Sequence, residues 1–170
     1  KFRIISARAP IELGPSSFAW YQVDFSSGKP VYNQVQERKS REAILTFIEE
    51  LKEHHSFDKN EVYMVGFSQG AIMSYSVALT HPEKIKGIGI LSGRLLEEIK
   101  PIVNKDHLNT LNVFISHGIQ DQVLTIAYAD DAASYLKSLG VNASFKKYDV
   151  GHGINQEMLT DLVTWMSNQK

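Results

Sequence analysis

Residues 62–74 read VYMVGFSQGAIMS, and this stretch decides the fold. The apolar, β-rich run from Val62 to Phe67 predicts a strand, and the run from Ala71 to Leu79 predicts a helix that follows almost at once. The helix is expected to close at His81 and Pro82, because proline cannot continue an α-helix. A strand, a tight turn and a helix in this order form the unit from which parallel sheets are built.

The same alternation of strand and helix continues on both sides of this stretch. The further expected strands are Phe2 to Ala7, Ile85 to Leu91, Leu111 to Ser116 and Ala143 to Tyr148, and the further helices are Glu37 to His54, Thr125 to Leu139 and Ile154 to Met166. Pro10 to Phe18 is expected to be a loop, because glycine, proline and serine interrupt it. The pattern predicts an α/β fold with a mostly parallel sheet and helices on both faces. No repeat or linker divides the chain, so residues 1–170 are expected to form a single domain.

Composition excludes several classes of function. A length of 170 residues with 43% hydrophobic and 22% charged content fits one domain with a buried core. Lysine and arginine number 18 against 19 acidic residues, so the basic surface of a nucleic-acid-binding protein is not expected. The absence of cysteine excludes disulfides, a thiol nucleophile and cysteine-ligated metal. No apolar run approaches the ~18 residues that span a bilayer, so stable membrane insertion is not expected.

Ser68 is the candidate nucleophile. It lies at the centre of Gly66-Phe67-Ser68-Gln69-Gly70, a G-x-S-x-G stretch between the expected strand and helix. Such a turn lifts the serine above the sheet with strained backbone angles, and the glycines permit close approach of the backbone. The backbone N–H of Gln69 then lies at a helix start, where it can face a developing oxyanion. The pattern also arises by chance, and a serine hydroxyl needs a base, so partner residues must be found.

Asp121 and His152 are the candidate partners. Residues 117–123 read HGIQDQV directly after one expected strand, and residues 149–153 read DVGHG directly after another. Because the carboxyl ends of parallel strands meet at one edge of a sheet, the carboxylate and the imidazole are expected beside Ser68. The order serine, aspartate, histidine is the order found in α/β hydrolases.

Two alternatives remain open within this triad. His117 also ends a strand and is a second candidate base, although Gly118 after it favours a packed turn that holds the loop of Asp121. Asp149 is a second candidate acid, but its short loop would have to fold back to reach His152. The other histidines and the helical aspartates are expected to lie outside the site, and they are His54, His55, His81, His107, Asp130 and Asp131. None of them predicts a metal site.

The sequence resembles the phospholipase/carboxylesterase family, which includes the acyl-protein thioesterases. The resemblance covers nearly the whole chain and rests on residues 66–74, Leu91-Ser92-Gly93, His117-Gly118 with Asp121 and Val123, Gly151-His152, Ala9-Pro10 and Trp20-Tyr21. It implies an α/β-hydrolase fold and a cytoplasmic serine hydrolase without metal or organic cofactor. The implied substrates are small-molecule carboxylic esters, lysophospholipids or acyl thioesters.

The resemblance also implies a role for each site residue. Ser68 is the nucleophile that forms an acyl-enzyme, His152 is the general acid and base, Asp121 orients the histidine, and the backbone N–H of Gln69 is one oxyanion donor. The acyl chain is expected to lie against apolar residues near the edge of the sheet, any of which could equally be plain core: Ile11, Phe18, Trp20, Ile72, Leu95 and Leu96.

The sequence departs from the family pattern in two places. Gln122 and Thr125 stand where many relatives carry prolines, and the upstream His-Gly segment that supplies the second oxyanion donor has no counterpart. In the family an earlier strand lies between those matching Phe2 to Ala7 and Val62 to Phe67. The fold is therefore expected to lack its N-terminal strands, with the two flanking strands roughly 10 Å apart. Direct hydrogen bonding of Ile4 to Ser6 with Val62 to Val65 would contradict this strand order.

Two other classes of function stay open. A catalytically silent α/β-hydrolase that serves as a small-molecule receptor would keep the fold and lose the chemistry. A doubly wound nucleotide-binding module is disfavoured, because neither G-x-G-x-x-G nor G-x-x-x-x-G-K-[ST] follows an expected strand.

Overall fold

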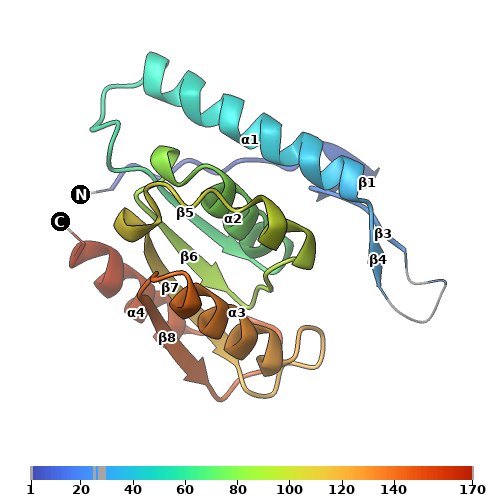
Figure 1. The fold of residues 1–170 in the computed structure, drawn as a ribbon. Coiled ribbons are helices and arrows are strands. Elements are labelled where there is room, and N and C mark those ends of the chain that lie inside the picture. The colour runs from blue at the N-terminus through green and yellow to red at the C-terminus, as the bar shows by residue number, and fades with distance from the viewer. Residues whose placement is uncertain (1, 25, 27–29, 170) are drawn as a thin grey trace.

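A four-stranded parallel sheet forms the centre of the molecule (Figure 1). The structure is a computed structural model that describes residues 2–24, 26 and 30–169. The strands lie side by side in chain order, and they are β5 Tyr63–Phe67, β6 Gly87–Leu91, β7 Asn112–Gly118 and β8 Ala143–Tyr148. All three strand pairs are parallel, so all four carboxyl ends lie at the same edge. The expected fold class is confirmed.

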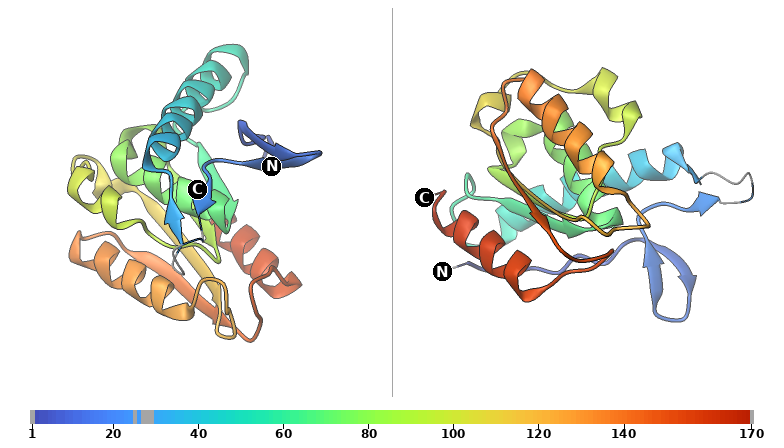
Figure 2. Two further views of the ribbon diagram at one scale, coloured as in Figure 1. Left: turned by 90° about the vertical axis from the view of Figure 1, so that its right-hand side faces the viewer. Right: turned by 90° about the horizontal axis from the view of Figure 1, so that it is seen from below.

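Helices cover both faces of this sheet (Figures 1 and 2). One face carries α1 Gln34–His54, α2 Gln69–Thr80 and α3 Ile126–Ser138, and the other carries α4 Gln156–Ser167. Asn33 caps α1 and Asn155 caps α4, each accepting a hydrogen bond from a first-turn N–H. All four helices were expected from the sequence, and their ends differ from the expected ones by a few residues.

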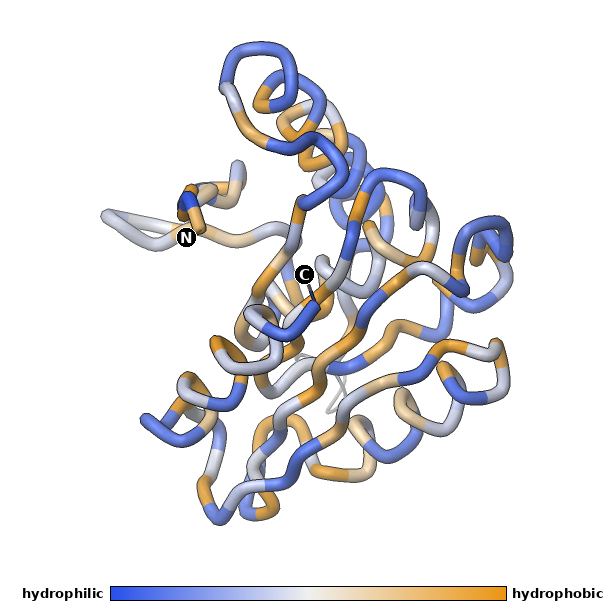
Figure 3. Tube along the Cα trace, turned by 90° about the vertical axis from the view of Figure 1, so that its left-hand side faces the viewer, coloured by the Kyte–Doolittle hydropathy of each residue, from blue (hydrophilic) through white to orange (hydrophobic). Residues whose placement is uncertain are grey.

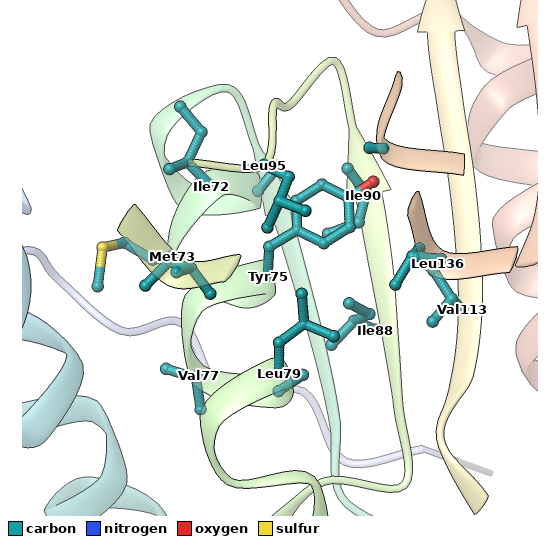
Figure 4. Packing of buried hydrophobic residues seen from close by; sticks show 14 of the residues in the cluster. Ile72, Met73, Tyr75, Val77, Leu79, Ile88, Ile90, Leu95, Val113 and Leu136 are labelled. Carbon is teal, nitrogen blue, oxygen red and sulfur yellow. The ribbon is translucent and has the colours of Figure 1, made fainter. Parts of the chain in front are cut away.

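The core has two parts, because side chains alternate between the two faces of a strand. Ile88 and Ile90 of β6 point toward α2, where they meet a large cluster that includes the fully buried Tyr75 (Figure 4). Leu91 belongs to a smaller cluster on the opposite face, formed with Phe114, Leu162, Trp165 and Met166. Every residue of α2 from Ala71 onward is buried, since the helix lies between the sheet and α1. In Figure 3 the central strands carry many hydrophobic positions, whereas the outer loops are largely hydrophilic.

The connections contain short elements that the sequence did not predict. Two antiparallel pairs precede α1: β1 Ile11–Gly14 with β2 Ser17–Ala19, and β3 Val23–Asp24 with β4 Val31–Tyr32. Three 3₁₀ helices follow α2, at η1 Pro82–Lys84, η2 Glu97–Ile102 and η3 Leu108–Thr110. The expectation of a loop from Pro10 to Phe18 is therefore wrong. Its glycine, proline and serine residues form the turn of a hairpin, in which Ser16 has a positive φ of 59°.

The expected strand from Phe2 to Ala7 is also wrong. No strand is assigned to residues 2–9, and Ile4 is 91% exposed. An apolar, β-rich run forms a strand only where a neighbour pairs with its backbone. Within the described chain β5 pairs with β6 alone, and no pairing between residues 4–6 and β5 is found. The expected separation of roughly 10 Å between a strand at Phe2 to Ala7 and β5 stays a prediction, because Phe2 to Ala7 forms no strand from which to measure it.

Candidate active site

The turn between β5 and α2 places Ser68 at the carboxyl edge of the sheet. Ser68 has φ 51° and ψ −115°, a conformation that side-chain-bearing residues rarely adopt. Its N–H is bound to the carbonyl of Leu91 at the end of β6, 2.9 Å away. Serine at the start of a helix usually caps it, but the Ser68 hydroxyl makes no capping bond to α2. The strained turn therefore leaves the hydroxyl available to another partner.

That partner is His152, in the loop after β8. Its Nε2 lies 3.0 Å from Ser68 Oγ, and its Nδ1 lies 2.7 Å from Asp121 Oδ2. The Phe67 ring packs against the imidazole with a centroid separation of 5.0 Å. The structure thus brings together the three side chains that the sequence singled out, from loops after three different strands.

Asp121 is almost completely buried and is held on both oxygens. Its Oδ1 accepts hydrogen bonds from the N–H groups of Val123 and Leu124 at 2.9 and 2.8 Å, while Oδ2 accepts one from His152. Burial alone would raise the pKa of Asp121, but these hydrogen bonds outweigh burial and hold the pKa below its ordinary value. An ionised Asp121 can only accept, so Nδ1 of His152 carries the proton. Nε2 is then the acceptor that faces the Ser68 hydroxyl.

The loops of Asp121 and His152 are joined by their backbones. Ile119 N–H donates to the Tyr148 carbonyl, and Gln120 N–H donates to the Val150 carbonyl at 3.1 Å. Gly118 fits against Val150 so closely that a Cβ there would overlap its carbonyl group. This backbone contact fixes the carboxylate loop relative to the imidazole loop.

The two alternative residues occupy other positions. Asp149 is exposed and its Oδ1 accepts a hydrogen bond from the Gln120 side chain at 2.6 Å, so it does not face His152. His117 is fully buried, and its Nε2 donates to the Leu124 carbonyl at 2.6 Å. The same nitrogen lies 3.3 Å from Asp121 Oδ2, whereas its Nδ1 has no partner among the described residues. His117 therefore packs beneath the loop of Asp121, without a hydrogen bond to Ser68.

The side chain of Gln69 has a position that the sequence did not reveal. Its Oε1 accepts from the N–H of Trp20 at 2.7 Å, and its Nε2 donates to the carbonyl of Tyr21 at 2.8 Å. The Ser40 hydroxyl of α1 donates to the Trp20 carbonyl. The residue after the nucleophile thus fixes the segment before β3 against the turn. A glutamine beside the nucleophile gives no sequence signal of a contact 48 residues away.

A pocket of about 210 Å³ opens between η2, α3 and β4. It is lined by Pro30, Tyr32, Arg94, Leu95, Leu96, Glu97, Glu98, Lys100, Tyr128, Asp131 and Ala132. Of the residues expected along an acyl chain, Leu95 and Leu96 line this pocket. Ile72 is buried in the main core, and Ile11 and Phe18 belong to the β1–β2 hairpin.

The remaining candidates lie outside the site. His54 ends α1, His81 Nδ1 lies 3.0 Å from the Thr80 hydroxyl, and Asp130 forms an ion pair with Lys147. Across residues 2–24, 26 and 30–169, no three histidine, cysteine or acidic side chains are grouped so as to hold a metal ion. Within the same residues, no helix has the length and hydrophobicity to cross a bilayer.

Residues 5–169 match the model of the phospholipase/carboxylesterase family. The chain belongs to this family. Curated members include a probable carboxylesterase of Oryza sativa subsp. japonica, which is 27% identical over 91% of this chain and 58% of its own length. Acyl-protein thioesterase 1 homolog 1 of Dictyostelium discoideum is 30% identical over 95% of this chain and 74% of its own length.

Solved structures agree with this family fold. A carboxylesterase from Mesorhizobium loti superposes with a TM-score of 0.77 at 20% identity, covering 94% of this chain and 72% of the other. The carboxylesterase of Bacillus cereus gives a TM-score of 0.74 at 16% identity, over 82% of this chain and 65% of the other. The α/β-hydrolase fold predicted from the sequence is confirmed. The chain spans less than two thirds of the length of the rice protein, at 58%, and of the Bacillus cereus carboxylesterase, at 65%.

Proposed function

We propose that the protein is a serine hydrolase that cleaves carboxylic esters or acyl thioesters through an acyl-enzyme. The observation that carries this proposal is the hydrogen-bonded series from Ser68 Oγ through His152 to Asp121, with distances of 3.0 and 2.7 Å. These distances lie within the range needed for proton transfer between a nucleophile and its base. Membership of a family with members named carboxylesterase and acyl-protein thioesterase supports the same reaction class.

In the first half-reaction the Ser68 hydroxyl attacks the carbonyl carbon of the substrate. The hydroxyl proton passes to Nε2 of His152 as the bond from Oγ to carbon forms, and the carbonyl oxygen becomes an oxyanion. The ionised Asp121 stabilises the resulting imidazolium and keeps the ring oriented. The bond to the leaving oxygen or sulfur then breaks, and Nε2 returns its proton to that atom. Water repeats the same steps on the acyl-enzyme and releases the carboxylic acid.

The oxyanion faces the start of α2 in this mechanism. The first N–H groups of an α-helix have no acceptor inside the helix, and the helix dipole adds partial positive charge there. Gln69 is the first residue of α2 and directly follows the nucleophile, so its N–H is the proposed donor. One such donor contributes on the order of 100- to 1,000-fold in rate.

A matched pair of serine variants tests this proposal. Ser92 follows β6 as Ser68 follows β5, has a similar positive φ of 50°, and its buried hydroxyl has no partner in the described chain. With a panel of p-nitrophenyl esters and acyl thioesters, Ser68→Ala is expected to abolish turnover while Ser92→Ala retains it. Wild-type protein without activity on any member of the panel would favour a catalytically silent receptor.

Two broader proposals concern the domain organisation and the location of the protein. We propose that residues 1–170 act as one domain, since both core clusters share a single sheet. We also propose, from the family resemblance, that the protein acts in the cytoplasm on small-molecule esters or thioesters. Nucleic acid is not a proposed partner, because the formal net charge is −1. Cell fractionation with an antibody against the protein tests the location.

A further inference from the structure

Arg94 lies near the candidate active site because it follows β6, whose end is bound to the turn that carries Ser68. Phe67 and Leu91 are paired in register at the ends of β5 and β6, and Ser68 N–H is bound to Leu91. Arg94 follows three residues after Leu91, so its Cα lies within roughly 17 Å of the Ser68 Cα even for a fully extended chain. A long side chain starting there can reach a substrate held at Ser68.

The guanidinium of Arg94 lies against two aromatic rings rather than a carboxylate. Its Cζ lies 5.7 Å from the centre of the Tyr32 ring and 5.5 Å from that of the Tyr128 ring. Within the described residues it forms no ion pair, and its buried Nε has no hydrogen-bond partner. By contrast, Arg41 is paired with Glu37. A buried donor without an acceptor destabilises a protein unless a ligand or water supplies one.

The same pocket contains a second unpartnered group. The Tyr32 hydroxyl is buried and has no hydrogen-bond partner in the described chain, and both Tyr32 and Arg94 line the pocket of about 210 Å³. Arg94 and Tyr32 therefore both border a space that holds several water molecules or a small organic group. A guanidinium matches the two oxygens of a carboxylate or the oxygens of a phosphate.

The acidic residues of this pocket are neutralised or lie in solvent. Glu97 is paired with Lys100 at 2.6 Å, and Glu98 is exposed, where its carboxylate accepts a hydrogen bond from the neutral Gln34 amide at 2.8 Å. Asp131 is exposed, where water and salt screen its charge. Arg94, which is half-buried, is the charge least screened from a ligand inside the pocket.

The pocket is also tied to the catalytic loops. The Tyr32 ring packs on Tyr21 with a centroid separation of 5.6 Å, and Tyr21 accepts the hydrogen bond from the Gln69 side chain. On the other side, Tyr128 lies in the first turn of α3, which follows the loop that carries Asp121. The Tyr32 ring is thus linked through Tyr21 to the residue after Ser68, and the Tyr128 ring lies on the helix that follows the Asp121 loop.

We propose that the Arg94 guanidinium, held between Tyr32 and Tyr128, binds an anionic oxygen group of the substrate, a carboxylate or a phosphate, while Ser68 attacks the ester a few bonds away. This inference rests on the proposed function and narrows its substrates to esters or thioesters that carry a negative charge. Leu95 and Leu96 on the pocket wall contact the carbon chain between the two ends.

Paired substrates test the inference by kinetics. The p-nitrophenyl monoesters of succinate, adipate and suberate are compared with neutral p-nitrophenyl esters of equal chain length. In wild-type protein one of the anionic esters should have the higher kcat/KM, and Arg94→Gln should reduce the anionic-to-neutral ratio on the order of 10- to 100-fold, mainly through KM. Arg38→Gln is the matched control, because it removes the same charge from an exposed position on α1 outside this pocket. An equal loss for both ester types, or the same effect in Arg38→Gln, would overturn the inference.

Binding without turnover separates this inference from the proposed function. Succinate and glycerol 3-phosphate are titrated into the intact protein, and binding is measured by calorimetry and by the rise in melting temperature. Binding of either anion that is lost in Arg94→Gln and kept in Arg38→Gln supports the anion site even if no ester is hydrolysed. Hydrolysis of neutral esters together with no Arg94-dependent anion binding would leave the hydrolase proposal standing and refute the anion site. Comparison of the two anions distinguishes a carboxylate site from a phosphate site.

Discussion

The two glycines of the G-x-S-x-G turn are predicted to respond oppositely to alanine. A Cβ at Gly66 would lie closer than 3.0 Å to the backbone of Gly70 and Ala71, at the start of α2. Backbone atoms cannot rotate away, so α2 would have to move. A Cβ at Gly70 meets nothing within 4 Å, and Gly70 is the second residue of α2 and has no positive φ.

The magnitudes follow from the surroundings of α2. Its residues are buried between the sheet and α1, so a shift large enough to admit the Cβ overpacks the core and costs about 1–3 kcal/mol of unfolding free energy or more. Movement of the turn also displaces Ser68 from His152, and a displacement of ~1 Å lowers kcat/KM about 100-fold. Gly70→Ala should instead stabilise the protein by about 0.5–1 kcal/mol, because alanine loses less backbone entropy in a helix.

Urea unfolding and ester hydrolysis on the same preparations measure both effects. Gly66→Ala should have a lower urea midpoint and a lower kcat/KM than the wild type, and Gly70→Ala a higher midpoint. The reasoning is refuted if Gly66→Ala unfolds at the wild-type midpoint, or if Gly70→Ala is the less stable of the two variants.

Further predictions concern the loops that hold the acid. Asp121→Asn should lower kcat by up to ~10⁴, since an amide favours the wrong histidine tautomer, and stopped-flow ester hydrolysis measures this. The pKa of the Asp121 carboxyl is lower in the folded protein than in the unfolded chain, so the ionised carboxylate stabilises the fold at pH values above its unfolded pKa of about 4. This stabilisation is lost as pH falls through the folded pKa. The stability difference between wild type and Asp121→Asn in urea should therefore shrink as pH falls below about 4; a difference that grew there would contradict the assignment. Gly118→Ala should lower kcat/KM about 100-fold by forcing the two loops apart, whereas Gly153→Ala, with open space at its Cβ, should not. His117→Ala should cost about 1–3 kcal/mol in urea unfolding, because it leaves the half-buried Leu124 carbonyl without its donor; unchanged stability would show that this hydrogen bond contributes nothing.

The parallel sheet and the candidate triad could be predicted because both follow from local patterns. Apolar runs of strand length alternate with helical runs, and residues that follow parallel strands necessarily meet at one edge of the sheet. The structure places Ser68, Asp121 and His152 at that edge with hydrogen bonds between them. Strand β8 has the predicted bounds, and the other sheet strands differ by one or two residues at their ends.

The errors and omissions involve contacts between distant segments. Phe2 to Ala7 has the composition of a strand, but composition does not supply a partner strand. The hairpin from Ile11 to Ala19 was missed because its turn residues are the same as those of an irregular loop. The contacts of the Gln69 amide and the position of Arg94 between two tyrosines depend on how loops fold back, which no local pattern specifies.

The most direct measurement of the central claim is covalent labelling with a fluorophosphonate probe, followed by mass spectrometry of the digested protein. A serine activated by His152 should react with one equivalent of probe, and the added mass should map to the peptide that contains Ser68. Labelling should disappear in Ser68→Ala and fall sharply in Asp121→Asn. Absence of labelling in the folded wild-type protein, or a label on a different serine, would contradict the account.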